Sequence, residues 1–311
     1  MKAIFVVGPT AAGKSQLAIS IAQKFGGSII NCDSIQFYTH LKIGSAGPSD
    51  EDLKRAPHYL YSYVNPPTEM TAGKFLRDFH DLIETKKDLK FPLIIVGGTG
   101  FYVQALEKGM YDVPQIDPQL KQNIEAEIKE HGNEKAYKEL TDFDPETKIH
   151  INDAYRIGRA LEVKRAFNLK MSELKIQSLL NDDAETKLKL PFPSIKIGVD
   201  VDREVLKENI AQRTKKMLKA GFIDEVKSLI NEGHADWAPV NSIGYFEIKE
   251  YLAGRIAESD LEAMINQSTR QLTKKQKNWF KRDPDTKWVN LQSETAVAEI
   301  MDTIALFLKS V

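Results

Sequence analysis

GPTAAGKS (Gly8–Ser15) fits the spacing G-x-x-x-x-G-K-[ST] of a phosphate-binding loop. The apolar run Ala3–Val7 comes directly before it, and a helical pattern over Gln16–Phe25 comes directly after, which is the strand–loop–helix context that the motif needs. In such a loop the backbone N–H groups point at phosphate oxygens, and the following helix adds its positive end. Lys14 is expected to bind outer phosphate oxygens, and the Ser15 hydroxyl a phosphate-bound Mg²⁺. The residues expected to bind the polyphosphate are Gly8, Pro9, Thr10, Ala11, Ala12, Gly13, Lys14 and Ser15.

The composition is that of an ordinary globular protein with room for one large domain or two smaller ones in 311 residues. No apolar stretch approaches the length of a membrane span, and because the chain begins in a strand we expect no signal peptide. Cys32 is the only cysteine and no Cys/His cluster has metal-ligand spacing, so we expect no internal disulfide and a reducing, cytoplasmic location.

The net charge of −1, from 43 basic and 44 acidic residues, argues against non-specific coating of nucleic acid. A local basic surface is still compatible with it, and Arg270–Arg282 contains six basic residues and no acidic one. Taken alone, such a run is more often a solvated helix face. Trp279 and Phe280, within the run, are expected in the core.

The first third of the chain alternates strands and helices. Strand patterns at 28–32 and 93–96 are separated by a helical pattern at 71–87. This alternation predicts a parallel sheet with helices on both faces. Ligands in such sheets bind beyond the carboxyl ends of the strands, so the loops after Val7, Cys32 and Val96 are expected to converge on one site.

The middle of the chain changes to helical periodicity alone, from about 117 to 173, and the polar segment 177–193 indicates a linker. A strand pattern at 195–199 returns the chain to the sheet, and further helices follow, with a short strand near Trp288. The sequence therefore predicts an α/β fold: a P-loop NTPase-like core with a parallel sheet flanked by helices, plus a helical insertion domain. The expected boundaries are 1–113 for the first part of the core, 114–190 for the insertion and 191–311 for the return to the core.

Two groups outside the loop are candidates for chemistry. Asp33 follows a strand expected beside the phosphate-loop strand, where a carboxylate can hold Mg²⁺ through water, accept a proton from a nucleophile, or merely cap a turn. Arg213 lies on a helix after the strand 195–199, and such arginines either neutralise a leaving phosphate or form an ordinary surface ion pair. Gly97-Gly98-Thr99 stands where many phosphate-loop hydrolases place an acidic residue, which argues against a GTPase switch or a motor ATPase.

A series of segments resembles one family, the tRNA dimethylallyltransferases, also called isopentenyl-tRNA transferases. They occur in family order and cover nearly the whole chain. They are GPTAAGKS (8–15), DSIQFY (33–38), IGSA (43–46), PHYL (57–60), VGGTGFYVQAL (96–106), INDAYRIGRALEV (151–163), DREVLKENIAQRTKKMLKAGFIDEV (202–226), SIGYFE (242–247) and TRQLTKKQKNWF (269–280).

The resemblance implies a reaction. A dimethylallyl group would move from dimethylallyl diphosphate to the exocyclic N6 of the adenosine next to the anticodon, on its 3′ side, in tRNAs that read codons beginning with U. Asp33 matches the family's proposed base, and Thr10 a hydroxyl that contacts the bridging region of the diphosphate. Lys14, Arg213 and Mg²⁺ would stabilise the leaving diphosphate. Nucleotide-binding proteins share the phosphate-loop motif. Here the loop would bind the diphosphate of the prenyl donor, so the use of ATP is doubtful.

The resemblance also implies an RNA surface, because single-stranded loops are read by splaying out and stacking their bases. The insertion would grip the anticodon stem, and Arg270–Arg282 would track phosphates. We expect no membrane contact and a monomer. The residues expected to bind tRNA are Asp33, Ser34, Ile35, Gln36, Thr99, Lys121, Tyr155, Arg156, Ile157, Gly158, Arg159, Asn241, Ser242, Ile243, Gly244, Tyr245 and Phe246.

Three residues depart from the family pattern. Gly47 stands where a lysine is usual, Lys121 where many members have arginine, and Tyr155 where glutamine or arginine is common. Each could retune RNA or substrate contacts, since lysine cannot replace a bidentate arginine fork. Two other classes of function remain open from the residues: a small-molecule kinase or a relative that prenylates free adenine nucleotides, and a non-enzymatic, nucleotide-dependent RNA-binding switch.

Overall fold

The computed structural model describes residues 1–110, 116–173 and 188–310, and the chain forms two compact units. The first unit comprises Met1–Lys108 and Leu190–Val311, and the second Gly109–Lys189. Most of the linker expected at 177–193 lies outside the described residues.

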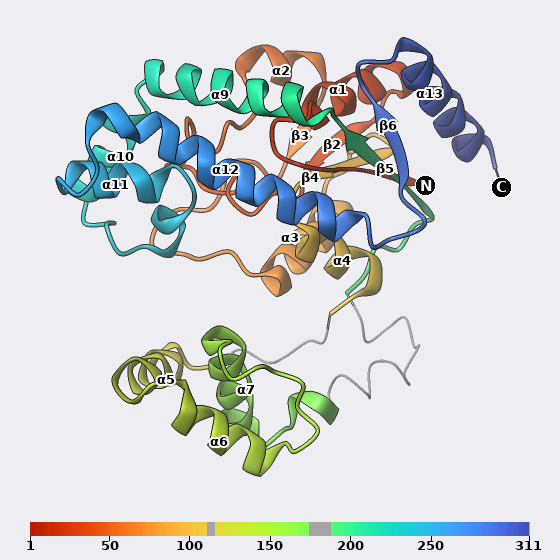
Figure 1. Cartoon of the computed structure of the whole chain (residues 1–311). Helices are drawn as coiled ribbons and strands as arrows, with labels where there is room; N and C mark the ends of the chain where they lie inside the picture. Colours follow the sequence, from red (N-terminus) through yellow and green to blue (C-terminus); the bar gives the residue numbers. More distant parts are fainter. Residues whose placement is uncertain (111–115, 174–187, 311) are drawn as a thin grey trace. The chain divides into compact units, whose positions relative to one another are not determined.

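The first unit is built on a six-stranded sheet with the order β3-β2-β4-β1-β5-β6, in which every pair of neighbours is parallel (Figure 1). The strands are β1 (Ala3–Val7), β2 (Ser28–Asn31), β3 (His58–Tyr59), β4 (Leu93–Gly97), β5 (Ser194–Asp200) and β6 (Lys287–Asn290). β1 lies between β4 and β5, and its last residue, Val7, is level with Gly97 and Gly198. The predicted α/β fold with a parallel sheet is confirmed.

Helices cover both faces of this sheet because its strands are apolar on both sides. All five residues of β1 are buried, and Ile4 and Val6 belong to a core cluster with residues of α1 (Lys14–Phe25) and α13 (Glu294–Lys309). In Figure 1, α3 (Ala72–Thr85) and α4 (Gly100–Lys108) lie on the other side of the sheet. The structure therefore confirms the helices expected at 16–25 and 71–87, within two residues at each end.

The described part of the first unit contains six further helices. They are α2 (Asp50–Arg55), α9 (Arg203–Lys219), α10 (Phe222–Asn231), the 3₁₀ helix η1 (Ala238–Asn241), α11 (Tyr245–Leu252) and α12 (Glu258–Phe280). The long helices α9 and α12 pack side by side, and α11 packs against α10 and α12 (Figure 1).

The described part of the second unit includes the helices α5 (Pro118–His131), α6 (Asn133–Phe143) and α7 (Ala154–Phe167). They enclose their own small core, formed by the buried residues Ile124, Leu140, Ile157, Ala160 and Leu161. Across the described parts of both units, no helix has the length and apolar character needed to cross a bilayer.

Candidate active site

The phosphate loop has the backbone that its glycines permit. Gly8 has φ +137° and passes close to β5, where a Cβ atom would lie 2.7 Å from the carbonyl oxygen of Val199. Ala11 is left-handed (φ +63°), and Gly13 (φ +92°) caps α1, which begins at Lys14. The first N–H groups of a helix have no partner within the helix, so this loop presents them to an anion.

Two helices from the end of the chain hold the loop through side chains. Gln276 of α12 accepts a hydrogen bond from the backbone N–H of Thr10 (2.8 Å), and Asn209 of α9 donates to the carbonyl of Ala11 (3.2 Å). Gly98, after β4, makes room for this contact, because a Cβ atom there would lie 2.4 Å from Nε2 of Gln276. Neither Gln276 nor Asn209 was predicted as a site residue, although both lie in segments that carry the family resemblance.

Three charged groups lie close enough to affect one another beside the loop. Burial lowers the pKa of the Lys14 ammonium group to about 8, Asp33 opposes this shift, and Arg213 adds to it. Burial also lowers the pKa of Arg213, and the negative charge of Asp33 again opposes this shift. Lys14 Nζ donates to the carbonyl of Pro9 (2.8 Å). Two partly desolvated cations beside a phosphate loop favour an anionic ligand, because its charge would offset the cost of burying them.

Asp33 is held in place by the residue that ends β2. Asn31 Oδ1 accepts from the Asp33 N–H (2.8 Å), and Asn31 Nδ2 donates to the carbonyls of Asp33 (3.2 Å) and Leu60 (3.0 Å). One carboxylate oxygen of Asp33 accepts from the Ile35 N–H (3.2 Å). Asn31, which the sequence analysis did not single out, therefore orients the candidate base.

The loops after β2 and β4 meet, as the parallel strands predict. Thr99 Oγ1 accepts from the Ser34 N–H (3.1 Å) and donates to the Ser34 hydroxyl (3.2 Å). Gln36 Nε2 donates to the carbonyls of Ser45 (3.1 Å) and Ala46 (3.2 Å). The structure thus brings Ser34, Gln36 and Thr99 to the same edge of the sheet as the phosphate loop.

A small cavity of about 100 Å³ adjoins the loop at Ser15. Gln36 and Gly47 line it, together with apolar side chains such as Ile29 and Val96. Gly47, one of the departures from the family pattern, therefore faces the space next to the phosphate loop.

The other residues expected to bind tRNA divide between the two units. Asn241 ends η1 and the next five residues lead into α11, where Phe246 is 45% exposed, whereas Tyr245 is fully buried. The remainder, Lys121 and Tyr155 to Arg159, belong to the second unit, where Tyr155 is 79% exposed and Ile157 is buried in the core. A partner could reach the side chains of Phe246 and Tyr155, whereas those of Tyr245 and Ile157 pack inside their units.

Helix α12 presents most of the basic run to solvent. Five of its six basic residues are exposed, and the sixth, Lys277, forms an ion pair with Asp200. Phe280 is buried as expected, but the expectation for Trp279 was wrong, because its side chain is 39% exposed. The indole lies against Gly100 at the start of α4, where a Cβ atom would come within 2.2 Å of it.

The sheet, the phosphate loop and the charged groups at its mouth define a P-loop protein of the α/β class. Within that class the chain belongs to the IPP transferase family, whose model matches residues 36–283.

Similar proteins match nearly the whole chain. A tRNA dimethylallyltransferase from Bdellovibrio bacteriovorus is 46% identical over 310 residues, which cover 98% of each chain. One from Geobacter sulfurreducens is 35% identical, with 93% of this chain and 91% of that one covered. The crystal structure of a tRNA isopentenylpyrophosphate transferase from Bacillus halodurans has a TM-score of 0.68 at 27% identity and covers 98% of this chain and 95% of that one. A eukaryotic dimethylallyltransferase acting on tRNA has a TM-score of 0.78 at 25% identity, with coverages of 98% and 79%.

Proposed function

We propose that this protein transfers a dimethylallyl group from dimethylallyl diphosphate to N6 of the adenosine on the 3′ side of the anticodon in tRNA, releasing diphosphate. The observation that carries the proposal is the grouping of Asp33, Lys14 and Arg213 at the phosphate loop, in a chain of the IPP transferase family. The relatives' names supply the substrates, and the site supplies groups of the required chemistry.

The leaving group needs positive charge and hydrogen-bond donors. As the bond between the allylic carbon and oxygen breaks, negative charge builds on the diphosphate, and stabilising that charge lowers the barrier. The loop N–H groups, Lys14 and Arg213 are donors of this kind, and the Thr10 hydroxyl would contact the bridging region of the diphosphate, as the family resemblance implies. Because Gln276 and Asn209 fix the loop beforehand, little reorganisation is required when the charge develops.

The nucleophile needs a base. An exocyclic adenine amine is a poor nucleophile and must lose a proton as it forms the new bond. Asp33 lies within electrostatic reach of Lys14 and Arg213, and Asn31 fixes its backbone. Asp33 therefore takes the proton from N6, while Ser34, Gln36 and Thr99, at the same edge of the sheet, contact the base.

Mg²⁺ fits this site as a companion of the diphosphate. Ser15 is exposed at the start of α1, whereas the described residues contain no group of three or more His, Cys, Asp or Glu side chains arranged for a metal ion. Mg²⁺ commonly binds through one or two protein oxygens, substrate phosphates and water. Held by Ser15 and phosphate oxygens, it would neutralise charge on the leaving group.

The tRNA anticodon stem-loop is the partner that the remaining features suit. Exposed cations on α12 offer phosphate contacts, and the exposed Tyr155 and Phe246 offer faces for stacking. The second unit would hold the stem. We expect the protein to act as a monomer in the cytoplasm, a compartment that suits its one free, buried cysteine, Cys32.

The test is a transfer assay with purified protein, Mg²⁺, radiolabelled dimethylallyl diphosphate and unmodified tRNA reading codons that begin with U, with AMP as the alternative acceptor. We expect label on tRNA. Asp33→Asn should lower kcat by about 10²- to 10⁴-fold, because the amide cannot accept the proton. Asp202→Asn, which neutralises an exposed carboxylate just before α9, is the matched control and should retain activity.

Each other outcome points to a different class. Label on AMP alone would move the protein to free-nucleotide prenylation. The absence of label on either acceptor would refute prenyl transfer and leave the kinase to be tested with ATP. Full transfer by Asp33→Asn would remove Asp33 from the role of base.

A further inference from the structure

One carboxylate outside the phosphate loop receives four hydrogen bonds. Glu225 of α10 accepts through Oε2 from the backbone N–H groups of Lys42 (2.9 Å) and Ile43 (2.7 Å). Through Oε1 it accepts from the Gly44 N–H (3.1 Å) and from the hydroxyl of Tyr245 (2.7 Å). Three successive N–H groups around one anion form a concave nest, so this carboxylate fixes the path of the backbone at residues 42–44.

The segment that Glu225 holds continues directly into the active site. The next two carbonyls, of Ser45 and Ala46, both accept from Nε2 of Gln36. The Ser45 carbonyl also accepts from Nη2 of Arg213 (3.4 Å). A shift of the 42–44 backbone would therefore move the carbonyls that orient both the guanidinium group of Arg213 and the amide of Gln36.

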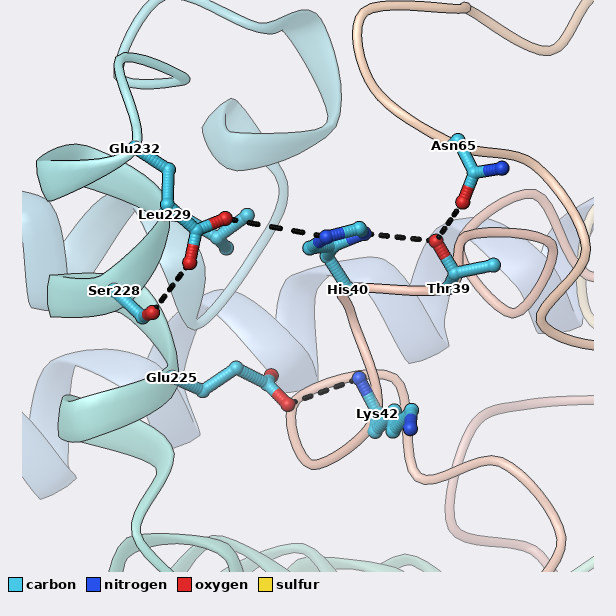
Figure 2. Close-up of a pocket in the computed structure, with 8 residues that line it drawn as sticks. All are labelled: Thr39, His40, Lys42, Asn65, Glu225, Ser228, Leu229 and Glu232. Atoms are coloured by element: carbon cyan, nitrogen blue, oxygen red, sulfur yellow. Dashed lines mark hydrogen bonds and ion pairs between the residues drawn. The ribbon is translucent and has the colours of Figure 1, made fainter.

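A second carboxylate in the same cavity, that of Glu232, makes no hydrogen bond to the 42–44 backbone and is therefore a natural comparison for Glu225. Both Glu225 and Glu232 line a cavity of about 460 Å³ between α10 and the loop after β2 (Figure 2). Figure 2 shows Glu225 directed at Lys42, whereas Glu232 turns toward His40, at 3.9 Å, and Ser228. Glu232, which caps the C-terminal end of α10, thus lines the same cavity, but its carboxylate bonds only side chains.

We propose that Glu225 is a positioning residue for the transfer reaction: by binding the N–H groups of residues 42–44, it holds the Ser45 and Ala46 carbonyls that aim Arg213 at the leaving diphosphate and fix Gln36 beside the acceptor base. The inference rests on the proposed function for the identity of these ligands. It predicts that a substitution at Glu225, away from the reacting atoms, slows the chemical step. Misplacing Arg213 and Gln36 weakens their stabilisation of the transition state more than it weakens substrate binding.

The test compares Glu225→Gln with Glu232→Gln in the full-length protein. In Glu225→Gln one carboxylate oxygen becomes an NH₂ group that faces N–H or O–H donors, so at least one part of the nest is lost without a change of volume. We expect kcat to fall about 10- to 100-fold, with a much smaller change in KM for dimethylallyl diphosphate. Amide hydrogen exchange at 42–46 should accelerate. Glu232→Gln should match the wild type in both measurements.

A double-mutant cycle separates positioning from a general loss of structure. If Glu225 acts through Arg213, adding Glu225→Gln to Arg213→Lys should cost less than adding it to the wild type. Tyr245→Phe, which removes one of the four hydrogen bonds and leaves the N–H contacts, should slow turnover less than Glu225→Gln. Thermal unfolding of each variant verifies that it is folded.

The results distinguish this inference from the proposed function. Independent, multiplicative losses in the cycle, or unchanged kcat despite faster exchange at 42–46, would overturn the positioning role. If the wild type transfers no label, the proposed function fails. Amide hydrogen exchange at 42–46 then decides the inference: faster exchange in Glu225→Gln but not in Glu232→Gln supports it, and equal exchange in the two variants refutes it.

Discussion

Raising the pH from 7 to 9 should weaken the binding of dimethylallyl diphosphate about tenfold, through the deprotonation of Lys14 alone. Burial lowers the pKa of this group from 10.5 to about 8 in the free protein. A bound diphosphate favours the charged ammonium, so the pKa rises on binding, and above pH 8 the protein must take up a proton to bind. The charged fraction of Lys14 falls from about nine-tenths at pH 7 to about one-tenth at pH 9, which gives the tenfold difference.

Isothermal titration calorimetry at pH 7, 8 and 9, in buffers of different ionisation enthalpy, measures both the affinity and the protons taken up. The wild type should take up about 0.1 proton at pH 7 and about 0.9 at pH 9. The ligand itself has completed its last ionisation by pH 7 to 8, because phosphate groups of this kind have a pKa near 6. Lys14→Arg is the matched control, since arginine stays protonated throughout this range.

Two results would refute the reasoning. One is a wild-type affinity that is the same at pH 7 and pH 9, and the other is a pH dependence that persists in Lys14→Arg. The pKa of Lys14 also affects the stability of the protein. Below pH 8 Lys14 is charged in both the folded and the unfolded chain, whereas between pH 8 and 10.5 the unfolded chain binds more protons. The contribution of Lys14 to the free energy of unfolding should therefore rise with pH over that interval.

Two further variants test contacts within each unit. Gln276→Ala removes the acceptor of the Thr10 N–H, so it should lower the free energy of unfolding by about 1 kcal/mol and weaken diphosphate binding several-fold in calorimetry. The control, Gln271→Ala, changes an exposed side chain and should alter neither quantity. Equal effects of the two substitutions would contradict the role of Gln276 in anchoring the loop. In the second unit, Arg165 lowers the pKa of Glu139 to about 2, so this pair stabilises the fold above pH 4.5 and loses its contribution as the pH falls toward 2. Arg165→Leu should raise amide exchange in α7 at pH 7 by an amount equivalent to about 1 kcal/mol and much less at pH 2, and a difference independent of pH would argue against the ion pair.

The sequence predicts the core of this fold because its signals are local. The phosphate loop lies between an apolar run and a helical pattern, and the strand–helix alternation that follows requires a parallel sheet. β3 was not predicted, since the two residues His58 and Tyr59 carry no periodic pattern, and only pairing with Ile29 and Ile30 defines them as a strand.

The site was predictable where a motif carries the chemistry and not where a distant side chain holds the motif in place. Asp33 and Arg213 stand out by residue type and by their positions after strands. Asn209, Glu225 and Gln276 act through hydrogen bonds to backbone groups that are 182 to 266 residues away in sequence, and such contacts leave no periodicity or spacing to detect. Exposed polar residues of similar types lie near them in the sequence, so only the three-dimensional structure distinguishes Asn209, Glu225 and Gln276 from those residues.

The central position of β1 has a consequence for how this chain is made. β1 is complete at residue 7, but one of its two neighbours, β5, begins at Ser194, which follows the whole second unit in the sequence. The loop that follows β1 takes its anchors from still later residues, Asn209 and Gln276. During synthesis one edge of β1 therefore stays unpaired until most of the chain has left the ribosome. The second unit depends on contacts that are short-range in sequence, so it can fold earlier. A long-lived exposed strand is a target for chaperones and a route to aggregation, so the yield of folded protein should depend on the rate of translation between residues 108 and 200.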